Sequence, residues 1–323
     1  MPVNQQQIAR ELNLSVITVS RALRNHPDLA ESTRARILQK AAEMGYRKSL
    51  SKRQEEPVSR RVGVLFYDGE GNWGQTPLDS GVIREIYREL QRECQRNRVE
   101  TLIEMPGLDE TPMLVKNKAV DALFLFGRYT PAAVARLGEI PALAVSSFLD
   151  GGKLPRIVAD NFHGMREATE HLIRLGHREI LFSSPLARLT QLFQERADGY
   201  VVAMHRHGLR PELYFHEPET PAAERFSGFS AAVCSCDAEA QHLHGALRAR
   251  GMRIPDDFSL VAFDDLAGSR DFQLTTYAPD WALMGRLAAS LLPANAAAIR
   301  GKPVVITVPG KLIVRGSTAP VCR

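Results

Sequence analysis

The segment that decides the N-terminal fold reads NQQQIARELNLSVITVSRALRN over residues 4–25 and ESTRARILQKAAEMGY over residues 31–46. Apolar residues recur at helical spacing in both parts, which predicts three short amphipathic helices. Asn4 is expected to cap the first helix, and Ser15 the second. Asn13 marks a tight turn between them, because asparagine tolerates positive φ. The residues expected to face inward are Ile8, Ala9, Leu12, Val19, Ala22, Leu23, Ile37, Leu38 and Ala41.

The second helix leaves an outer face that can contact a partner. Val16 and Ile17 in its first turn can pack on thymine methyl groups, and Arg21 can donate two hydrogen bonds to a guanine in the major groove. The third helix is expected to run to about Met44, with Gly45 at its C-terminal cap. The alternative is an ordinary three-helix packing unit with no ligand. The candidate DNA-contacting residues of this region are Asn4, Gln5, Ser15, Val16, Ile17, Thr18, Ser20, Arg21, Asn25, Thr33 and Tyr46.

The charge distribution favours the DNA-binding interpretation. Residues 1–61 contain 12 Lys+Arg and 6 Asp+Glu, a net charge of +6. The other 262 residues contain 29 Lys+Arg and 31 Asp+Glu, a net charge of −2. The formal charge of +4 therefore comes from the N-terminal region, as expected for a phosphate-binding module attached to a near-neutral body.

Composition predicts a soluble protein with more than one domain. The chain has 323 residues, of which 44% are hydrophobic and 24% charged, enough to bury a large core. No run of 18 apolar residues and no apolar N-terminal segment occur, so we expect a cytoplasmic protein without membrane partners. The four cysteines, at positions 94, 234, 236 and 322, form no regular disulfide framework and suit a reducing compartment.

From about Arg61 the sequence alternates between short apolar runs and helical stretches. This pattern is typical of buried parallel strands in an α/β protein. The predicted strands are VGVLFY (62–67), ALFLF (122–126), ALAVS (142–146), EILFS (179–183), AAVCS (231–235) and SLVAF (259–263).

The whole chain resembles the lactose-repressor/galactose-repressor (LacI/GalR) family of transcriptional regulators. The resemblance begins with the N-terminal segment quoted above and continues in the right order through the body. The body segments that carry it are DNFHGMREATEHLIRLGHREILF (160–182), RADGY (196–200), CDAEAQHLHGALRARGMRIPDDFSLVAFDD (236–265), LTTYAPDWALMGRLAASLL (274–292) and KLIVRGST (311–318).

The resemblance implies a helix-turn-helix head and a periplasmic-binding-protein-like body of two doubly wound α/β subdomains. It places the head at 1–46, a hinge or linker at 47–61 and an effector-binding and dimerisation domain at 62–323. The N-subdomain would comprise about 62–160 and 280–309, and the C-subdomain about 161–278 and 311–323. Chain crossings are expected near Asp160, near Tyr277 to Asp280, and near Pro309 to Lys311.

The linker is where the chain departs most from the family. Relatives have a Pro-Asn pair after the tyrosine that corresponds to Tyr46, then a hinge helix whose leucine wedges into the minor groove. This chain has Lys48 and Ser49 at the pair and Glu55 at the wedge, where a carboxylate is repelled by phosphates. Residues 49–56 either form one or two helical turns that present Lys52 and Arg53 to DNA, or remain a basic tether.

The resemblance also places an effector in a cleft between the subdomains. Arg196 and Asp264 match family effector contacts, and their chemistry suits a sugar or a similar polar metabolite. The alternative is a salt bridge across the cleft with no ligand. Further candidates are Asp160, Cys236, which replaces the asparagine of relatives, and Trp73, which could stack on a sugar ring. The stretches 104–118 and 214–230 are short for the helix and strand units of relatives.

We expect no metal, cofactor or catalytic residue. The cysteines at 234 and 236 with His242 and His244 suggest a zinc site, but the two histidines lie about 200° apart on a predicted helix. His177 is expected to be a structural turn residue. The sequence contains no G-x-S-x-G and no phosphate-binding loop, so an enzyme is not expected.

These observations predict a DNA-binding transcriptional regulator that responds to a small carbohydrate-like effector. A homodimer would bind a roughly palindromic operator on double-stranded DNA. One alternative is a DNA-binding regulator without a small-molecule effector. Another is a sugar-binding protein whose head is vestigial, which the basic head and Arg21 disfavour.

Overall fold

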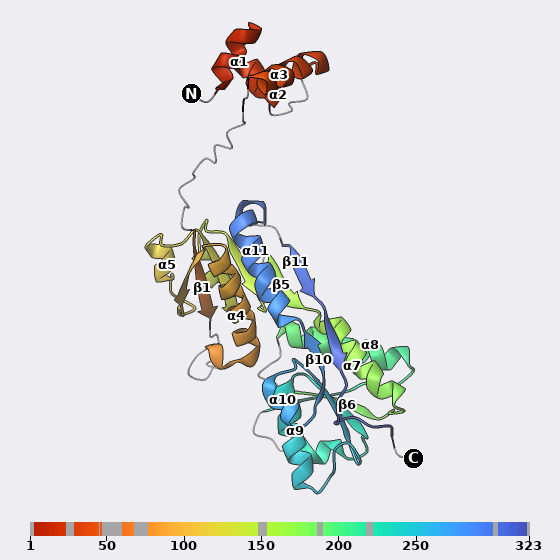
Figure 1. The fold of residues 1–323 in the computed structure, drawn as a ribbon. Coiled ribbons are helices and arrows are strands. Elements are labelled where there is room, and N and C mark those ends of the chain that lie inside the picture. Colours follow the sequence, from red (N-terminus) through yellow and green to blue (C-terminus); the bar gives the residue numbers. More distant parts are fainter. Residues whose placement is uncertain are drawn as a thin grey trace. The chain divides into compact units, whose positions relative to one another are not determined.

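The computed structural model describes residues 3–23, 29–44, 46, 60–67, 77–147, 154–185, 190–217, 222–299 and 303–321. The chain divides into two compact units, a head (Met1–Val58) and a body (Ser59–Arg323) (Figure 1). The linker positions Lys52, Arg53 and Glu55 lie outside the described residues.

The head consists of three helices, which are α1 (Gln5–Leu12), α2 (Val16–Leu23) and α3 (Glu31–Glu43). Asn4 caps α1 as predicted, since its side chain accepts a hydrogen bond of 2.9 Å from the backbone N–H of Gln7. Asn13 ends α1 with φ 51°, the left-handed conformation that the turn requires. The sequence therefore determines both ends of α1 through local hydrogen bonds and backbone preference.

The core of the head is small and apolar. Its buried residues are Ile8, Ala9, Val19, Ala22, Ile37 and Ala41. Leu38 is 46% exposed, so its predicted inward orientation is wrong. Ile37 and Ala41, four residues apart, occupy the inward face of α3, and Leu38 lies about 100° further round the helix. Met44 ends α3, and Gly45 lies outside the described residues.

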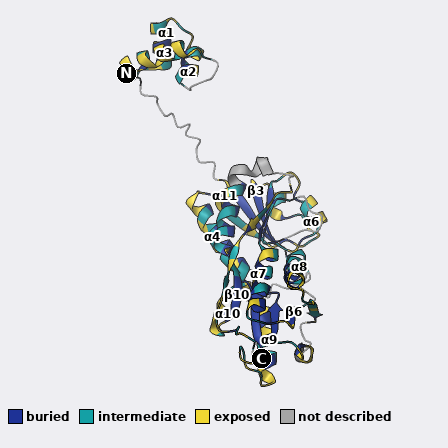
Figure 2. Ribbon diagram, turned by 90° about the vertical axis from the view of Figure 1, so that its right-hand side faces the viewer, coloured by how far each residue is buried: buried dark blue, intermediate teal, exposed yellow. Residues whose placement is uncertain are grey.

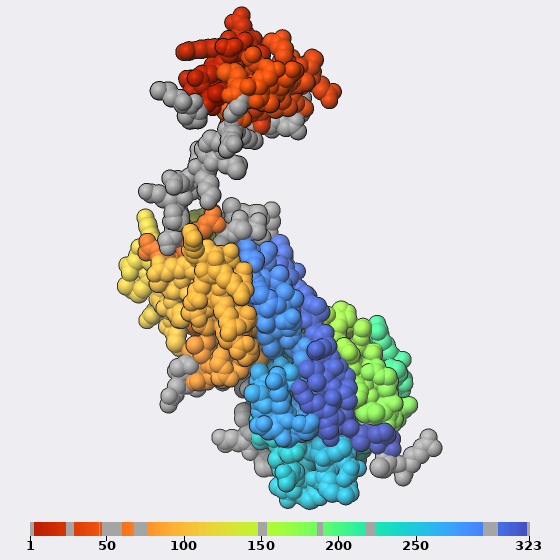
Figure 3. All heavy atoms as spheres, viewed as in Figure 1, coloured from red at the N-terminus to blue at the C-terminus, as the bar shows by residue number. Residues whose placement is uncertain are grey.

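The first sheet of the body has six parallel strands in the order β11-β5-β4-β3-β1-β2. The strands are β1 (Arg61–Tyr67), β2 (Glu100–Glu104), β3 (Ala122–Gly127), β4 (Ala142–Val145), β5 (Arg156–Ala159) and β11 (Val305–Val308). Helices α4 (Gly81–Arg96) and α11 (Trp281–Ile299) pack against each other on one face (Figure 3). The short elements of this half are η1 (Pro77–Asp79), α5 (Met113–Lys116) and α6 (Pro131–Ala135).

The second sheet has the order β12-β10-β9-β8-β6-β7, and β12 alone pairs antiparallel among these described strands. The strands are β6 (Ile180–Pro185), β7 (Glu212–His216), β8 (Ala231–Cys234), β9 (Ser259–Phe263), β10 (Thr275–Pro279) and β12 (Gly310–Ile313). Apolar side chains of α7 (Asn161–Arg174) and α8 (Gln191–Arg206) share one buried cluster with Phe182 and Phe263. Those of α9 (Asp237–Ala249) join Leu181 and Leu260 in the other cluster. The buried strands thus lie between helices (Figure 2), and two short elements, η3 (Ala222–Phe226) and α10 (Ala267–Asp271), complete this half.

All six predicted strands are confirmed, as β1, β3, β4, β6, β8 and β9. The other six strands were not predicted from their local pattern. Four of these, β2, β7, β11 and β12, are edge strands with partly exposed residues, so they are less apolar or shorter in sequence than the central strands. The short stretch 104–118 contains only a four-residue helix, α5, after β2 ends.

The chain passes three times between the two sheets. Strand β5 ends at Ala159 and is followed by α7 of the second sheet, while β10 ends at Pro279 and is followed by α11 of the first. Strand β11 ends at Val308, and β12 begins at Gly310 in the other sheet. Because neighbouring parallel strands share one direction, the carboxyl ends of the parallel strands in both sheets face these crossings. This edge is where α/β proteins bind ligands.

No helix in the described part of the chain is both long enough and apolar enough to cross a membrane.

Candidate functional site

The first turn of α2 is built by a local hydrogen-bond arrangement. Ser15 accepts a 3.0 Å hydrogen bond from the backbone N–H of Thr18, so Ser15 caps this helix as predicted. The hydroxyls of Ser15 and Thr18 are also 2.8 Å apart. The cap leaves Val16 41% and Ile17 67% exposed at the start of the helix. Two apolar side chains thus lie at the surface of the most basic part of the sequence.

The other predicted DNA contacts of the head differ in exposure. Arg21 is exposed on α2, whereas Ser20 and Thr33 are half-buried. Gln5 donates a 3.1 Å hydrogen bond from its amide to the hydroxyl of Tyr46, which ties the start of α1 to the end of the head. Asn25 lies outside the described residues.

The second candidate site centres on the guanidinium of Arg196, which is buried on α8. Its Nη2 lies 3.3 Å from Oδ1 of Asp264, so the predicted convergence of these two residues is present. Its Nε donates to the side-chain oxygen of Asn161 at 2.9 Å, and its Nη1 to the carbonyl of Ser235 at 2.7 Å. The guanidinium carbon also lies 3.8 Å from the ring centroid of Phe263. Arg196 therefore joins α7, β9 and the loop after β8.

Asp264 is held in an unusual backbone conformation directly after β9. Its φ is 127°, in the region that favours glycine, and such strain is common at functional sites. Its N–H donates to the carbonyl of Tyr277 at 2.9 Å, and its own carbonyl accepts the indole N–H of Trp281 at 2.9 Å. These contacts to β10 and α11 orient the carboxylate beside Arg196.

Asn161 and Trp281 were not predicted as site residues. Each follows directly on a crossing residue between the sheets, Asp160 or Asp280, and this position was the available signal. Asn161 also donates to Ala159 O and to a carboxylate oxygen of Glu195, at 3.2 and 3.3 Å. Asn161 therefore links Arg196 to the end of β5 through hydrogen bonds.

The remaining predicted effector residues are Cys236, Asp160 and Trp73. Cys236 is fully buried as the N-cap residue of α9, and its side chain does not cap the helix. Asp160 caps α7, accepting from the backbone N–H of His163 at 3.1 Å and lying 2.9 Å from its Nδ1. Trp73 lies outside the described residues.

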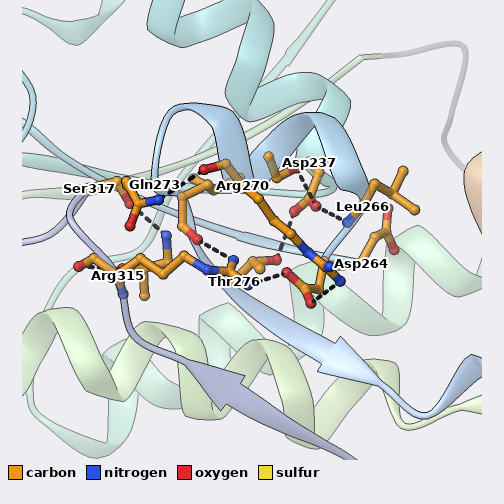
Figure 4. A network of polar contacts seen from close by, with 12 residues as sticks. Asp237, Asp264, Leu266, Arg270, Gln273, Thr276, Arg315 and Ser317 are labelled. Carbon is orange, nitrogen blue, oxygen red and sulfur yellow. Dashed lines mark hydrogen bonds and ion pairs between the residues drawn. The ribbon is translucent and has the colours of Figure 1, made fainter.

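Asp237, next to Cys236, anchors a polar network around the carboxyl edge of the second sheet (Figure 4). Its carboxylate accepts hydrogen bonds from Leu266 N at 2.8 Å, Ser269 Oγ at 2.5 Å and Thr276 Oγ1 at 2.7 Å. Burial raises the pKa of the Asp237 carboxyl, and these three bonds act in the opposite direction. With its acceptors already in use, Asp237 fixes the loop after Asp264 and the start of α9.

The cysteine and histidine positions considered for zinc do not converge. The ring of His242 faces that of His216 at 6.0 Å, whereas the ring of His244 faces Phe272 at 4.8 Å. Among the described residues, no group of three or more His, Cys, Asp or Glu is placed to hold a metal ion. His177 is buried, and its ring nitrogens contact Ser230 Oγ and Ala319 O at 2.8 and 3.0 Å, in agreement with the predicted structural role.

Comparisons with known proteins match both units of the chain. Residues 6–49 match the family described as bacterial regulatory proteins, lacI family, and residues 169–318 match the periplasmic binding protein-like domain. The probable HTH-type transcriptional repressor ExuR of Bacillus subtilis (strain 168) is 25% identical over 286 residues, which cover 83% of each chain.

Solved structures show the same fold. The Lac repressor dimer bound to operator and the anti-inducer ONPF has a TM-score of 0.66 at 20% identity and covers 99% of this chain and 100% of its own. The regulator CCPA from Weissella paramesenteroides with bound sucrose has a TM-score of 0.67 at 22% identity, with coverage of 81% and 100%. Fold and site thus define a helix-turn-helix protein with a periplasmic-binding-protein-like body. The head thus matches the lacI family of bacterial regulatory proteins, and the body matches the periplasmic binding protein-like domain.

Proposed function

We propose that this protein is a cytoplasmic transcriptional repressor that binds a specific DNA sequence and responds to a small polar metabolite, a sugar or sugar derivative. The observation that carries the proposal is the exposed first turn of α2, where Val16 and Ile17 lie at the surface of a basic head. Exposed apolar side chains at this point have a natural partner in thymine methyl groups. The relatives are regulators rather than enzymes, and we propose no catalytic activity.

DNA recognition divides between charge and groove contacts. The net charge of +6 over residues 1–61 supports binding to phosphates, which is independent of sequence and weakens with salt. Exposed Arg21, one turn beyond Ile17 on α2, supplies a donor pair for a guanine. Phosphate contacts thus position the head, and the outer face of α2 specifies the sequence.

We expect a homodimer that places two α2 helices in successive major grooves of a roughly palindromic operator. The body offers an apolar surface for self-association at β2, the edge strand of the first sheet. Ile103, Met105 and Met113 are 51%, 53% and 54% exposed there. A two-fold contact would bury these side chains against the same surface of the second copy.

Effector binding is coupled to DNA binding through contacts that join the two sheets. Nη1 of Arg156 on β5 donates to the side chain of Gln191 on α8 at 3.0 Å. On α4, a Cβ atom added at Gly81 would lie 2.8 Å from the side chain of Leu266, so these two residues are in contact. A ligand bound at the carboxyl edges of the two sheets changes these contacts. In each copy of the dimer, the first sheet then shifts together with the head that is attached to it. Effector and operator then affect each other's affinity reciprocally.

A regulator without a small-molecule effector is the second candidate function. It is favoured by the contacts of Arg196, whose three nitrogens each have a partner within the chain. In that case the Arg196–Asp264 pair serves only to hold α8 against β9. The two candidates share the same DNA-binding activity and differ in ligand binding.

The first experiment is selection of bound duplexes from a random DNA pool by the full-length protein, followed by titration at several salt concentrations. Enrichment of a palindrome with a steep salt dependence supports the proposal. Recovery of no preferred sequence contradicts it.

Calorimetry with neutral sugars such as D-ribose, sucrose and cellobiose then separates the two candidates. Saturable heat that is lost in Arg196→Ala supports an effector. Arg253→Ala is the matched control, because Arg253 is an exposed arginine that pairs with Asp257 at 3.1 Å before β9 begins. Absence of heat from every sugar favours the second candidate.

A further inference from the structure

Two serine hydroxyls at the carboxyl edge of the second sheet are buried without a hydrogen-bond partner. Ser184 on β6 and Ser235 directly after β8 are both 0% exposed, and the Oγ atom of each lacks any partner. Ser183 pairs with Cys234 in the register of β6 and β8, and the N–H of Ser235 donates to Ser183 O at 2.9 Å. Ser184 and Ser235 are the next two residues in this register and therefore lie side by side.

Both hydroxyls lie on the α8 side of the sheet. The preceding residue, Ser183, points to the α9 side, where its hydroxyl donates to Glu239 at 2.5 Å. Because side chains alternate along a strand, Ser184 points to the opposite side, the side of Phe182 and Phe263. Ser235 shares this side by the same alternation, and its carbonyl accepts the Nη1 bond of Arg196. Ser235 thus contacts Arg196 through its carbonyl, and Ser184 lies next to Ser235 on the same side of the sheet.

An unpaired buried hydroxyl is costly and uncommon. Most buried polar side-chain atoms have a partner, and those that lack one require an explanation such as a missing ligand or water. Alanine at either position would fill nearly the same space without the desolvation cost. Two neighbouring unpaired hydroxyls, one of them on a residue that contacts Arg196, therefore point to a polar ligand group that binds them.

We infer that Ser184 and Ser235 together bind one hydroxyl group of the effector and so select a neutral sugar over a sugar acid. This inference rests on the proposed function. A serine hydroxyl both donates and accepts, so a ligand hydroxyl can accept from one serine and donate to the other. A carboxylate could also accept from both serines, but the Asp264 carboxylate, 3.3 Å from Arg196, compensates the nearby positive charge and repels a second anion.

The two hydroxyls are covered by other side chains of the body. Since neither serine is exposed, the ligand reaches them only after the side chains that cover them move. Effector binding therefore includes a conformational step of the body, in agreement with coupling between the ligand and the heads.

The test compares thermal unfolding and sugar binding of full-length Ser184→Ala, Ser235→Ala and the double variant. Without sugar, we expect melting temperatures equal to or above that of the wild type, because an unpaired buried hydroxyl is removed. With D-ribose, sucrose or cellobiose, whichever shifts the wild-type melting temperature, we expect affinity to fall about fivefold to tenfold for each serine removed. D-glucuronate is expected to give no shift.

Ser183→Ala is the matched control, since Ser183 is equally buried on the same strand but donates to Glu239. It is expected to lower the melting temperature and to leave sugar affinity within about twofold. Monodeoxy derivatives of the binding sugar complete the test. One of them is expected to bind the wild type more weakly and to bind the double variant as well as the parent sugar does.

The possible failures are distinguishable. Serine variants that melt earlier without sugar would show that the hydroxyls have partners within the protein, and this would overturn the inference. Serine variants with unchanged sugar affinity, or tighter binding of D-glucuronate than of the neutral sugars, would also overturn it. If no sugar shifts the wild type, the proposed carbohydrate effector fails, and the inference fails with it.

Discussion

Gly199 lies where the backbones of α7 and α8 meet, and we expect Gly199→Ala to destabilise the body. A Cβ atom at this position would lie 2.3 Å from the carbonyl oxygen of Phe162 and 3.1 Å from the backbone nitrogen of Arg166. Ordinary van der Waals contact begins at 3.4 Å, so the two helices must separate by roughly 1 Å. Both opposing atoms belong to the backbone, so no side-chain rotation relieves the contact.

The expected loss in the free energy of unfolding is the difference between two opposing effects. Overpacking of a close contact costs about 3 kcal/mol at the upper end of its usual range. Alanine regains about 1 kcal/mol over glycine within a helix. The net loss is therefore about 2 kcal/mol, or roughly 4–8 °C in melting temperature for a unit of this size. Arg196 lies three residues earlier on α8 and shifts with it, so effector affinity is expected to fall as well.

Thermal unfolding of the full-length protein checks this prediction. Gly245→Ala on α9 is the matched control, because no atom lies within 4 Å of its added Cβ. This control is expected to gain about 1 kcal/mol from helix propensity alone and to melt roughly 2–4 °C higher. A Gly199→Ala protein that melts at or above the wild-type temperature would refute the close approach of α7 and α8.

Three further predictions concern the head, the dimer and the pH dependence. Arg21→Ala is expected to weaken binding to the selected operator by about 1–3 kcal/mol in duplex titrations, while non-specific binding changes little; equal losses on both DNAs would contradict base contact. Ile103→Asp is expected to shift the protein towards monomer in sedimentation experiments, and an unchanged dimer would exclude the β2 surface. Burial lowers the pKa of His171 and His177 below the ordinary 6.5, although the hydrogen bond that the His177 ring donates to the carbonyl of Ala319 raises the pKa of His177. The stability that comes from keeping these histidines neutral is present above about pH 6.5 and is lost as the pH falls below that value. The melting temperature is therefore expected to be lower at about pH 5.5 than at about pH 7.5. In His177→Asn this difference is expected to be smaller.

Local sequence signals were sufficient to predict the structure wherever it depends on residues that are close in the sequence. Asn4 and Ser15 each accept a hydrogen bond from a backbone N–H three residues on, and Asn13 adopts the left-handed conformation that few residues tolerate. The central strands were equally predictable, because burial on both faces requires continuous apolar runs. Leu38 shows the limit of this reasoning, since helical spacing alone left two adjacent residues, Ile37 and Leu38, as candidates for the same inward face.

The effector site was predicted only in part, because its contacts join residues that are far apart in the sequence. Arg196 and Asp264 were found through family motifs, and the structure brings them to 3.3 Å. The roles of Asn161 and Trp281 depend on crossings between the sheets, which bring together residues far apart in the chain. Asp237 was not predicted as a site residue, although it accepts three hydrogen bonds from a loop and a strand that come later in the sequence.

The sequence by itself determined the three-helix head, its charge, the central strands and the pair Arg196 and Asp264. Each of these depends on residue types at short spacing or on a motif that is local in the chain. The tertiary structure alone decided which face of the second sheet each serine occupies and which polar groups lack partners. Ser183 and Ser184 are adjacent and chemically identical, but strand alternation gives one a buried carboxylate partner and leaves the other without a partner on the opposite side of the sheet. The formation of a hydrogen bond depends on what the fold places opposite each side chain, and no local pattern contains that information.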